Sequence, residues 1–122
     1  MSKQSGFTLI ELVMVIVILG ILGAIAVPKF VNLSSDATDA AKRGMSGAVK
    51  AAHSIAIAEN KTLPDIDTLI TYVSAEGLAA ANSGVSVDIN GSASIVPTFT
   101  DQACSVATTA TTDIVACVGT IP

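Results

Sequence analysis

The most constraining feature of this sequence is an apolar run close to its beginning. No charged or polar side chain occurs between Leu12 and Val27, and the wider segment from Phe7 to Val27 adds only Thr8 and Glu11 as polar residues. As a helix that rises about 1.5 Å per residue, this segment is long enough to cross a hydrocarbon layer of about 30 Å. A strand in the same place would leave unpaired backbone groups in lipid, so the sequence predicts a transmembrane helix.

The order of segments differs from that of an ordinary secretory signal. Such a signal has its cleavage site after the apolar run, whereas here a short polar segment, residues 1–6, precedes the run. Lys3 in this segment predicts a cytoplasmic location for the N-terminus, with the rest of the chain on the far side of the membrane. Removal of the polar segment would leave the apolar run in the mature protein.

The segment GFTLIELVMVIVILGILGAIAVPKF resembles the class III signal of type IV pilins and type II secretion pseudopilins. The resemblance implies cleavage between Gly6 and Phe7 by a prepilin peptidase, followed by N-methylation of Phe7. It also implies an α+β type IV pilin fold, in which a long N-terminal helix packs against a small antiparallel β-sheet head with one C-terminal disulfide. The first half of that helix would form the membrane anchor and the filament core.

The same resemblance implies the partners and the location of the chain. Before assembly the subunit would lie in the bacterial inner membrane, with its C-terminal head in the periplasm. The pilus assembly machinery would then join it with other pilin subunits into an extracellular homopolymer for adhesion, surface attachment or motility. The KFVNLSSDA stretch and the compact size resemble the mannose-sensitive haemagglutinin group of type IVa pilins.

Glu11 is the candidate subunit-assembly residue, because it interrupts the apolar run. A carboxylate inside a membrane costs about 3 kcal/mol on insertion scales and marks a functional site by default. Cleavage after Gly6 would place an ammonium group on Phe7, one helical turn from Glu11. Glu11 could pair with this amine in its own chain, or with the amine of a neighbouring subunit during assembly. The residues alone leave both interpretations open, and the resemblance to pilins favours assembly.

Gly20, Gly23 and Pro28 lie towards the other end of the run. Transmembrane helices commonly tolerate Gly and Pro, which is one explanation for these residues. Alternatively they weaken the helix, because Pro28 removes one backbone hydrogen bond and each glycine costs up to about 1 kcal/mol. The resemblance implies local unwinding of this segment within filaments.

Beyond Pro28 the pattern becomes amphipathic and predicts a continuing helix, with a bend, to about Glu59. The sequence is therefore divided into a leader (1–6), an apolar helix (7–30), an amphipathic helix (31–59) and a head (60–122). The predicted apolar face of the amphipathic part consists of small and aliphatic residues three or four positions apart: Phe30, Leu33, Ala37, Ala41, Gly44, Ala48, Ala52 and Ile55.

Within the head, a short helix is expected after Pro64, and several strands follow it. Val85 to Ile89 alternates apolar and polar residues as a half-buried strand does, and Asn90-Gly91 is a strong type I′ hairpin signal. The expected segments are a helix at 66–72, a helical or irregular stretch at 75–81, paired strands at 85–89 and 94–100, and further strand candidates at 103–107 and 114–118.

Cys104 and Cys117 are the two cysteines of the chain. A lone pair predicts a disulfide in a small exported domain, whereas the same pair in the cytosol would be free thiols. The expected export favours the disulfide. For a loop of this length, closure contributes about 3 kcal/mol in the chain-entropy model.

Composition and spacing exclude several classes of function. The net charge of −4 gives no electrostatic footprint for nucleic acid, and the 3% aromatic content is too low for electron conduction along stacked rings. His53 has no metal-binding partner near it in the sequence, and Asp65 and Asp67 are not followed by a calcium ligand series. Because there is also no nucleophile–base pair, the sequence predicts neither an enzyme nor a bound metal or cofactor.

Two alternatives to the filament subunit stay open at this stage. The first is a type II secretion pseudopilin or a minor pilin. The cysteine pair favours a pilin over major pseudopilins, which use calcium in that region, and Glu11 argues against the tip-priming pseudopilin. The second is a single-pass membrane protein with a ligand-binding exported domain, which would need neither cleavage after Gly6 nor methylation of Phe7.

Overall fold

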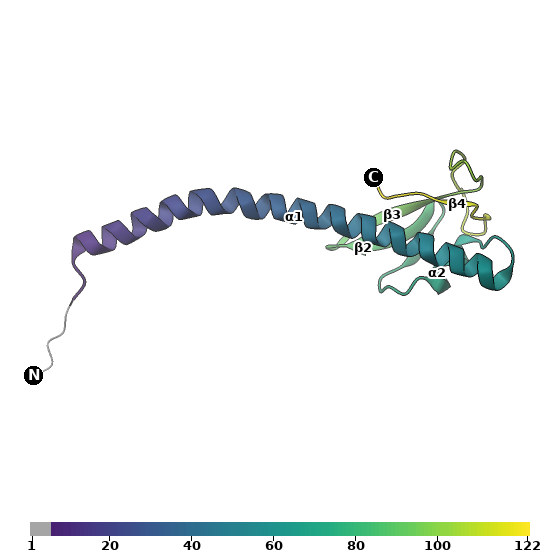
Figure 1. Ribbon diagram of the computed structural model, residues 1–122, viewed down its shortest axis with the longest axis horizontal. Helices are drawn as coiled ribbons and strands as arrows, with labels where there is room; N and C mark the ends of the chain where they lie inside the picture. Colours follow the sequence, from purple (N-terminus) through teal and green to yellow (C-terminus); the bar gives the residue numbers. More distant parts are fainter. Residues whose placement is uncertain (1–5) are drawn as a thin grey trace, which may run out of the picture. The chain divides into compact units, whose positions relative to one another are not determined.

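The computed structural model describes residues 6–122, apart from the side chain of Asn32 (Figure 1). All of the predicted leader except Gly6 therefore lies outside the described residues. The chain forms two compact units, Met1–Asp36 and Ala37–Pro122, and each is described by itself. Helix α1, Leu9–Asn60, contributes to both units.

The first unit contains the apolar part of α1. The helix begins directly after Thr8 and includes Pro28 in its interior. Pro28 has no N–H to donate to the carbonyl of Ala24, so one helical hydrogen bond is missing there. The backbone of this single chain is helical across Gly20 to Pro28. Because the predicted unwinding concerns assembled filaments, it stays a prediction.

In the second unit, α1 ends at Asn60. Lys61 then adopts a left-handed conformation with φ 57°, and its N–H donates to the Ile57 carbonyl at 2.8 Å. The buried face of this part of α1 consists of Ser46, Val49, Ala52 and Ala56. These residues recur every three or four positions, as expected for a helix covered on one side.

The apolar face predicted for α1 was wrong in the second unit by about one residue. Gly44, Ala48 and Ile55 are exposed, although Ala52 is buried as predicted. The error has a physical cause: alanine, glycine and serine differ little in size and apolarity, so neighbouring stripes of the helix look alike in sequence. The docking of the sheet decides which stripe is covered.

The head adds the short helix α2, Ile66–Tyr72, and one four-stranded antiparallel sheet. The bounds of α2 match the prediction. Its N-cap is Asp65, whose Oδ1 accepts the Thr68 N–H at 2.7 Å. The strands lie in the order of the sequence, β1 Ala79–Ala81, β2 Gly84–Ile89, β3 Ser92–Phe99 and β4 Cys117–Val118.

The hairpin between β2 and β3 confirms the turn prediction. Ile89 pairs with Ser92, so Asn90 and Gly91 form a two-residue loop, and both have positive φ values, 56° and 78°. This is the combination that a type I′ turn requires. Asp88 supports the turn, because its Oδ1 accepts the Gly91 N–H at 2.8 Å.

Three other segments differ from the prediction. Residues 79–81, within the stretch expected to be helical or irregular, form the edge strand β1. Residues 103–107 do not form a strand, and only Ala107 makes an isolated bridge, to Phe99. Of residues 114–118, only Cys117 and Val118 form a strand. A run of three alanines has no alternation to reveal a strand, and residues 100–116 follow turns that their own polar side chains stabilise.

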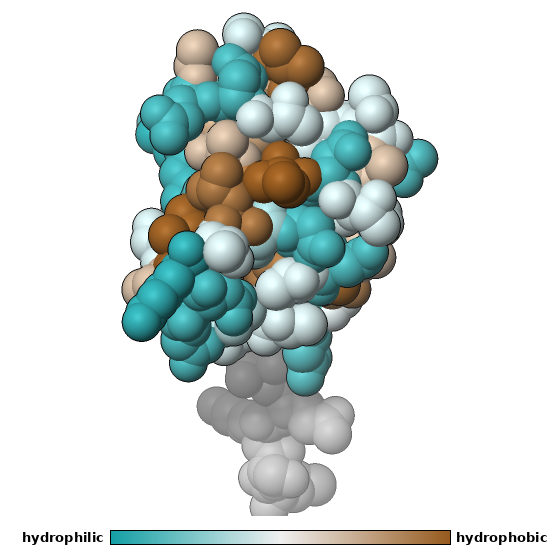
Figure 2. All heavy atoms as spheres, turned by 90° about the vertical axis from the view of Figure 1, so that its right-hand side faces the viewer, coloured by the Kyte–Doolittle hydropathy of each residue, from teal (hydrophilic) through white to brown (hydrophobic). Residues whose placement is uncertain are grey.

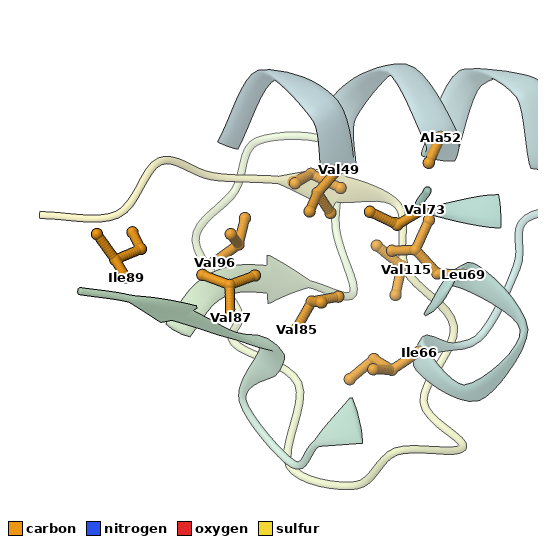
Figure 3. Packing of buried hydrophobic residues seen from close by; sticks show 11 residues of the cluster. Val49, Ala52, Ile66, Leu69, Val73, Val85, Val87, Ile89, Val96 and Val115 are labelled. Carbon is orange, nitrogen blue, oxygen red and sulfur yellow. The ribbon is translucent and has the colours of Figure 1, made fainter. Parts of the chain in front are cut away.

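The core of the second unit lies between α1, α2 and the sheet (Figure 3). It is entirely aliphatic, which agrees with the low aromatic content. Val49 and Ala52 project from α1, and Ile66 and Leu69 from α2, onto the strands. Its buried members are Val49, Ala52, Ile66, Leu69, Val73, Val85, Val87, Ile89, Val96, Val115 and Val118.

Candidate functional site

The first turn of α1 holds the ionisable residue of the apolar segment. Thr8 Oγ1 donates to Glu11 Oε2 at 3.4 Å and accepts the Glu11 N–H at the same distance. The order Thr8-Leu9-Ile10-Glu11 has the spacing of a capping box, and the half in which the Thr8 hydroxyl accepts the Glu11 N–H is present. The spacing of Thr8 and Glu11 is the sequence signal for this arrangement. The carboxylate is thereby placed at the positive end of the helix dipole.

Phe7 precedes this turn and is 81% exposed. Cleavage after Gly6 would make its backbone nitrogen an amine in the turn before Glu11. The structure thus places both predicted assembly residues at the beginning of α1, next to Thr8. Gly20, Gly23 and Pro28 lie further along the same helix and outside this group.

The apolar side chains of the first unit are exposed along the helix. Each large apolar side chain between Leu9 and Val31 has an exposed fraction of 39% or more. By length and composition, α1 could cross a membrane, and a signal sequence would meet the same two criteria. On the face that Figure 2 shows, hydrophobic residues form patches among hydrophilic and neutral ones. The first unit therefore requires either lipid or other apolar chains around it.

Comparison with known proteins agrees with these features. The prokaryotic N-terminal methylation motif matches residues 1–27. The chain is 43% identical over 81 residues to the type IV narrow pilus major component PilA5 of Thermus thermophilus, covering 66% of this chain and 68% of the relative. The chain belongs to the type IV pilin family.

Further pilin relatives match over smaller shares of their length. The fimbrial protein Q of Moraxella bovis is 38% identical over 99 residues, which cover 76% of this chain and 63% of that protein. The type IV major alpha-pilin of Moraxella bovis is 45% identical over 62 residues, or 51% of this chain and 39% of that protein. No solved structure matches the chain. None of these relatives distinguishes the mannose-sensitive haemagglutinin group, so that assignment stays a prediction.

Membership of this family makes the chain a structural subunit of a pilus. The methylation motif supports processing as a prepilin, and the apolar start of α1 fits both a membrane-anchored precursor and an extracellular pilus. The long helix, the small antiparallel sheet and the disulfide match the predicted pilin fold.

The predicted disulfide between Cys104 and Cys117 is present, with 5.5 Å between the two Cα atoms. Cys117 belongs to β4 and pairs with Phe99 of β3. The disulfide therefore fastens the loop between β3 and β4 to the edge of the sheet. His53 supports the same loop from α1, because its Nε2 lies 2.8 Å from the Val115 carbonyl oxygen.

Two aspartates fold the disulfide loop locally. Asp101 accepts hydrogen bonds from the Ser105 hydroxyl at 2.6 Å and from the Val106 N–H at 2.8 Å. Asp113 accepts the N–H groups of Thr109 at 2.7 Å and Ala110 at 3.0 Å. In both turns the aspartate lies four residues from the Ser or Thr that it binds, and this spacing is the sequence signal for the turns.

These hydrogen bonds also change the acidity of the two aspartates. The pKa of Asp101 is lowered, chiefly by the hydrogen bond from the Ser105 side chain. The pKa of Asp113 is lowered by the Thr109 and Ala110 backbone N–H groups. Donors favour the ionised carboxylate, so both turns are most stable when these aspartates are charged.

Buried hydroxyl groups form further hydrogen bonds that hold the C-terminal residues to β3 and α1. Thr98 and Thr108 are buried and lie 2.7 Å apart through their Oγ1 atoms. Ser46 Oγ donates to the Lys42 carbonyl at 2.8 Å and accepts the Ile121 N–H at 3.0 Å. Among residues 6–122, no group of three His, Cys, Asp or Glu side chains is arranged to hold a metal ion.

Proposed function

We propose that this pilin is stored in the inner membrane through residues 7–30, with its head on the periplasmic side. Prepilin peptidase cleaves between Gly6 and Phe7, and the Phe7 amine is methylated. The pilus assembly machinery then transfers the subunit into a filament that serves adhesion, surface attachment or motility. The observation that carries this proposal is the uncovered apolar surface of α1, combined with the methylation motif at residues 1–27.

The apolar surface explains storage and cohesion, but it does not select the position of a subunit in the filament. Full burial of a Val, Leu or Ile side chain is worth about 1.5–3 kcal/mol relative to water. A subunit leaving the membrane exchanges lipid for apolar protein, however, and lipid tails are as apolar as the new neighbours. A directional interaction must therefore favour the filament and set its register.

Glu11 supplies that interaction in our proposal. Its carboxylate lies within an apolar surface, where an unpaired charge costs about 3 kcal/mol. Its described partner, Thr8, is 3.4 Å away, which is long for a hydrogen bond between oxygen atoms. A neighbouring Phe7 amine would be a stronger, oppositely charged partner. Pairing between copies would neutralise both charges and fix the stagger of adjacent helices.

Gly20, Gly23 and Pro28 have a second role in this proposal. None of the three contributes a long side chain that would brace the helix, and Pro28 removes one of its hydrogen bonds. We assign this segment the ability to unwind in the filament, which would let the fibre extend. The same proposal divides the chain after the leader into the apolar helix (7–30), the amphipathic helix (31–59) and the head (60–122).

The test replaces Glu11 in the native host by Ala and by Gln. Both variants should accumulate in the membrane at the normal level but yield few sheared fibres, because the Phe7 amine loses its charged partner. Glu59→Gln is the matched control, since Glu59 is an exposed glutamate at the other end of α1. Normal amounts of fibre from either Glu11 variant would refute the assembly mechanism.

Two further measurements address maturation and subunit type. Mass spectrometry of sheared fibres should show an N-terminus at Phe7 that carries a methyl group, and an intact leader would refute the processing step. Cryo-EM of fibres from the native cell surface should show this chain throughout their length. Fibres built from another pilin would refute a role as major subunit.

A further inference from the structure

In the second unit, the middle of α1 between Asp39 and Glu59 carries only basic charged side chains, whereas the head beyond Lys61 carries only acidic ones. In α1, the charged side chains between residues 40 and 58 are all basic: Lys42, Arg43 and Lys50. Beyond Lys61, in contrast, every charged side chain is acidic: Asp65, Asp67, Glu76, Asp88, Asp101 and Asp113. One chain thus carries surfaces of opposite charge within a single compact unit.

The basic side chains available for contact lie on the outer face of α1. Arg43 and Lys50 are exposed and lie about two helical turns apart, hence on one side of the helix. Lys42 is half-buried, and its Nζ donates to the Pro122 carbonyl at 2.8 Å. Asp39 precedes Arg43 by one turn and offsets part of its charge. Lys50 has no acidic residue three or four positions away in α1 and is the centre of this basic face.

The residues beside Lys50 on the helix surface are small. Gly47 and Ala51 are exposed on this side, and a β-carbon placed on Gly47 would meet no atom within 4 Å. Another protein surface could therefore approach the helix closely, and Arg43 and Lys50 would project past the backbone towards it. We call Arg43, Gly47, Lys50 and Ala51 the basic face.

The matching acidic surface is formed by Glu76 and Asp88. A β-carbon placed on Gly77 would lie 3.6 Å from the Asp88 β-carbon, so the turn that carries Glu76 lies against β2 at Asp88. Both carboxylates are exposed. This acidic pair lies at the hairpin end of the sheet, where Asn90 Nδ2 donates to Thr38 Oγ1 at 3.0 Å.

Most other acidic residues of the head already have a structural role. Asp65 caps α2, and Asp101 and Asp113 hold the turns of the disulfide loop. Glu76 has no such role, and Asp88 uses one carboxylate oxygen, Oδ1, for the hairpin turn. The acidic pair therefore has carboxylate oxygens available to receive a basic partner.

We propose that the basic face of one subunit docks against the acidic pair of a second copy within the filament. This inference rests on the proposed polymerisation and names the surfaces that meet in the head region. A two-fold symmetric contact through the basic face would bring like charges together. A heterologous contact joins opposite charges and leaves one free surface at each end, so it propagates into a helical fibre when the rotation between subunits does not close a ring.

The direct test uses a carbodiimide, which joins a lysine amine to an adjacent carboxylate, on sheared wild-type fibres. Peptide mass spectrometry should find Lys50 linked to Glu76 or Asp88, and denaturing electrophoresis should show a ladder of covalent multimers. Lys50→Arg is the matched control, because it keeps the charge and the fibres but removes the reactive amine. Fibres without these links would refute the docking and leave polymerisation intact, whereas absence of wild-type fibres would refute both.

Charge reversal provides an independent test. Lys50→Glu should lower the fibre yield at least about tenfold, because like charges then face each other across the contact. Adding Glu76→Lys should restore the yield to within about twofold of wild type, because the pair is exchanged. Lys61→Glu makes the same charge change outside the basic face and should leave the yield unchanged. A normal yield from Lys50→Glu, or no rescue by Glu76→Lys, would overturn the inference.

Discussion

Replacement of Gly84 by alanine should destabilise the head strongly. Gly84 begins β2 with φ 150°, a region that side chains rarely adopt. An added β-carbon would lie 2.0 Å from the Val96 carbonyl oxygen and 2.9 Å from the Val96 carbonyl carbon. Both atoms belong to the backbone of the paired strand β3, so no side-chain rotation can relieve the overlap.

The size of the effect follows from two contributions. Holding alanine in this conformation costs about 1–3 kcal/mol. Moving the start of β2 away from β3 weakens one or two adjacent backbone hydrogen bonds, among them the one from Thr98 N–H to the Ser83 carbonyl at 3.2 Å, at about 1 kcal/mol each. The sum is about 2–5 kcal/mol, a large fraction of the roughly 5–15 kcal/mol by which small domains are stable.

Urea unfolding of the full-length chain in detergent measures this loss. Tyr72 is the only tyrosine, and the chain has no tryptophan, so intrinsic fluorescence reports on the head. Tyr72 is half-buried, and its hydroxyl oxygen accepts a hydrogen bond from Asn60 Nδ2 at 3.2 Å. Unfolding of the head should therefore change its emission.

Gly91→Ala is the matched control for this prediction. Gly91 also has a positive φ, 78°, but an added β-carbon there would meet nothing within 4 Å. Only the conformational cost of about 1–2 kcal/mol should remain. If Gly84→Ala lowers the free energy of unfolding no more than Gly91→Ala does, the steric argument is wrong.

Three other predictions concern the core and the disulfide loop. Leu69→Ala should lower the free energy of unfolding by about 2–5 kcal/mol in the same urea assay, because Leu69 is fully buried. A loss below about 1 kcal/mol would contradict the packing described. Replacing both Cys104 and Cys117 by serine should cost about 3 kcal/mol, because the bridge closes a segment with a sequence separation of 13; unchanged unfolding would show that other contacts alone order the loop. The pKa values of Asp101 and Asp113 are lowered from 3.8 in the folded chain. Both carboxylates therefore stabilise their turns fully above pH 3.8, and this stabilisation is lost as the pH falls through the lower, folded pKa. Hydrogen exchange should accordingly show these turns opening at acidic pH while the sheet stays protected, and equal protection of the turns at pH 6 and about pH 2 would refute this.

Several parts of the molecule could be predicted because their signals are local. The apolar run from Phe7 to Val27 specifies a helix without reference to the rest of the chain. Asn90-Gly91 specifies a hairpin because both residues tolerate positive φ, and Pro64 marks the approach to the start of α2. Each signal acts within a few residues, so the sequence alone contains it.

The candidate assembly residues were also named from local sequence signals, and their role in assembly stays a prediction. Glu11 stands out because a carboxylate in an apolar run is costly, and the glycine before Phe7 forms part of a recognisable processing motif. The two cysteines needed only the inference of export for their pairing to be expected. The spacing of Thr8 to Glu11 likewise indicates the capping contact at the start of α1.

The sequence by itself determined the helices, the hairpin and which candidate assembly residues lie at the beginning of α1. Only the tertiary structure decided which stripe of α1 is buried, that residues 79–81 form an edge strand, and how the disulfide loop folds. The physical reason is that these features depend on partners distant in sequence. Alanine, glycine and serine differ too little in apolarity to show in the sequence which stripe of α1 is buried. The three alanines at residues 79–81 form a strand only because the edge of β2 is available for backbone pairing.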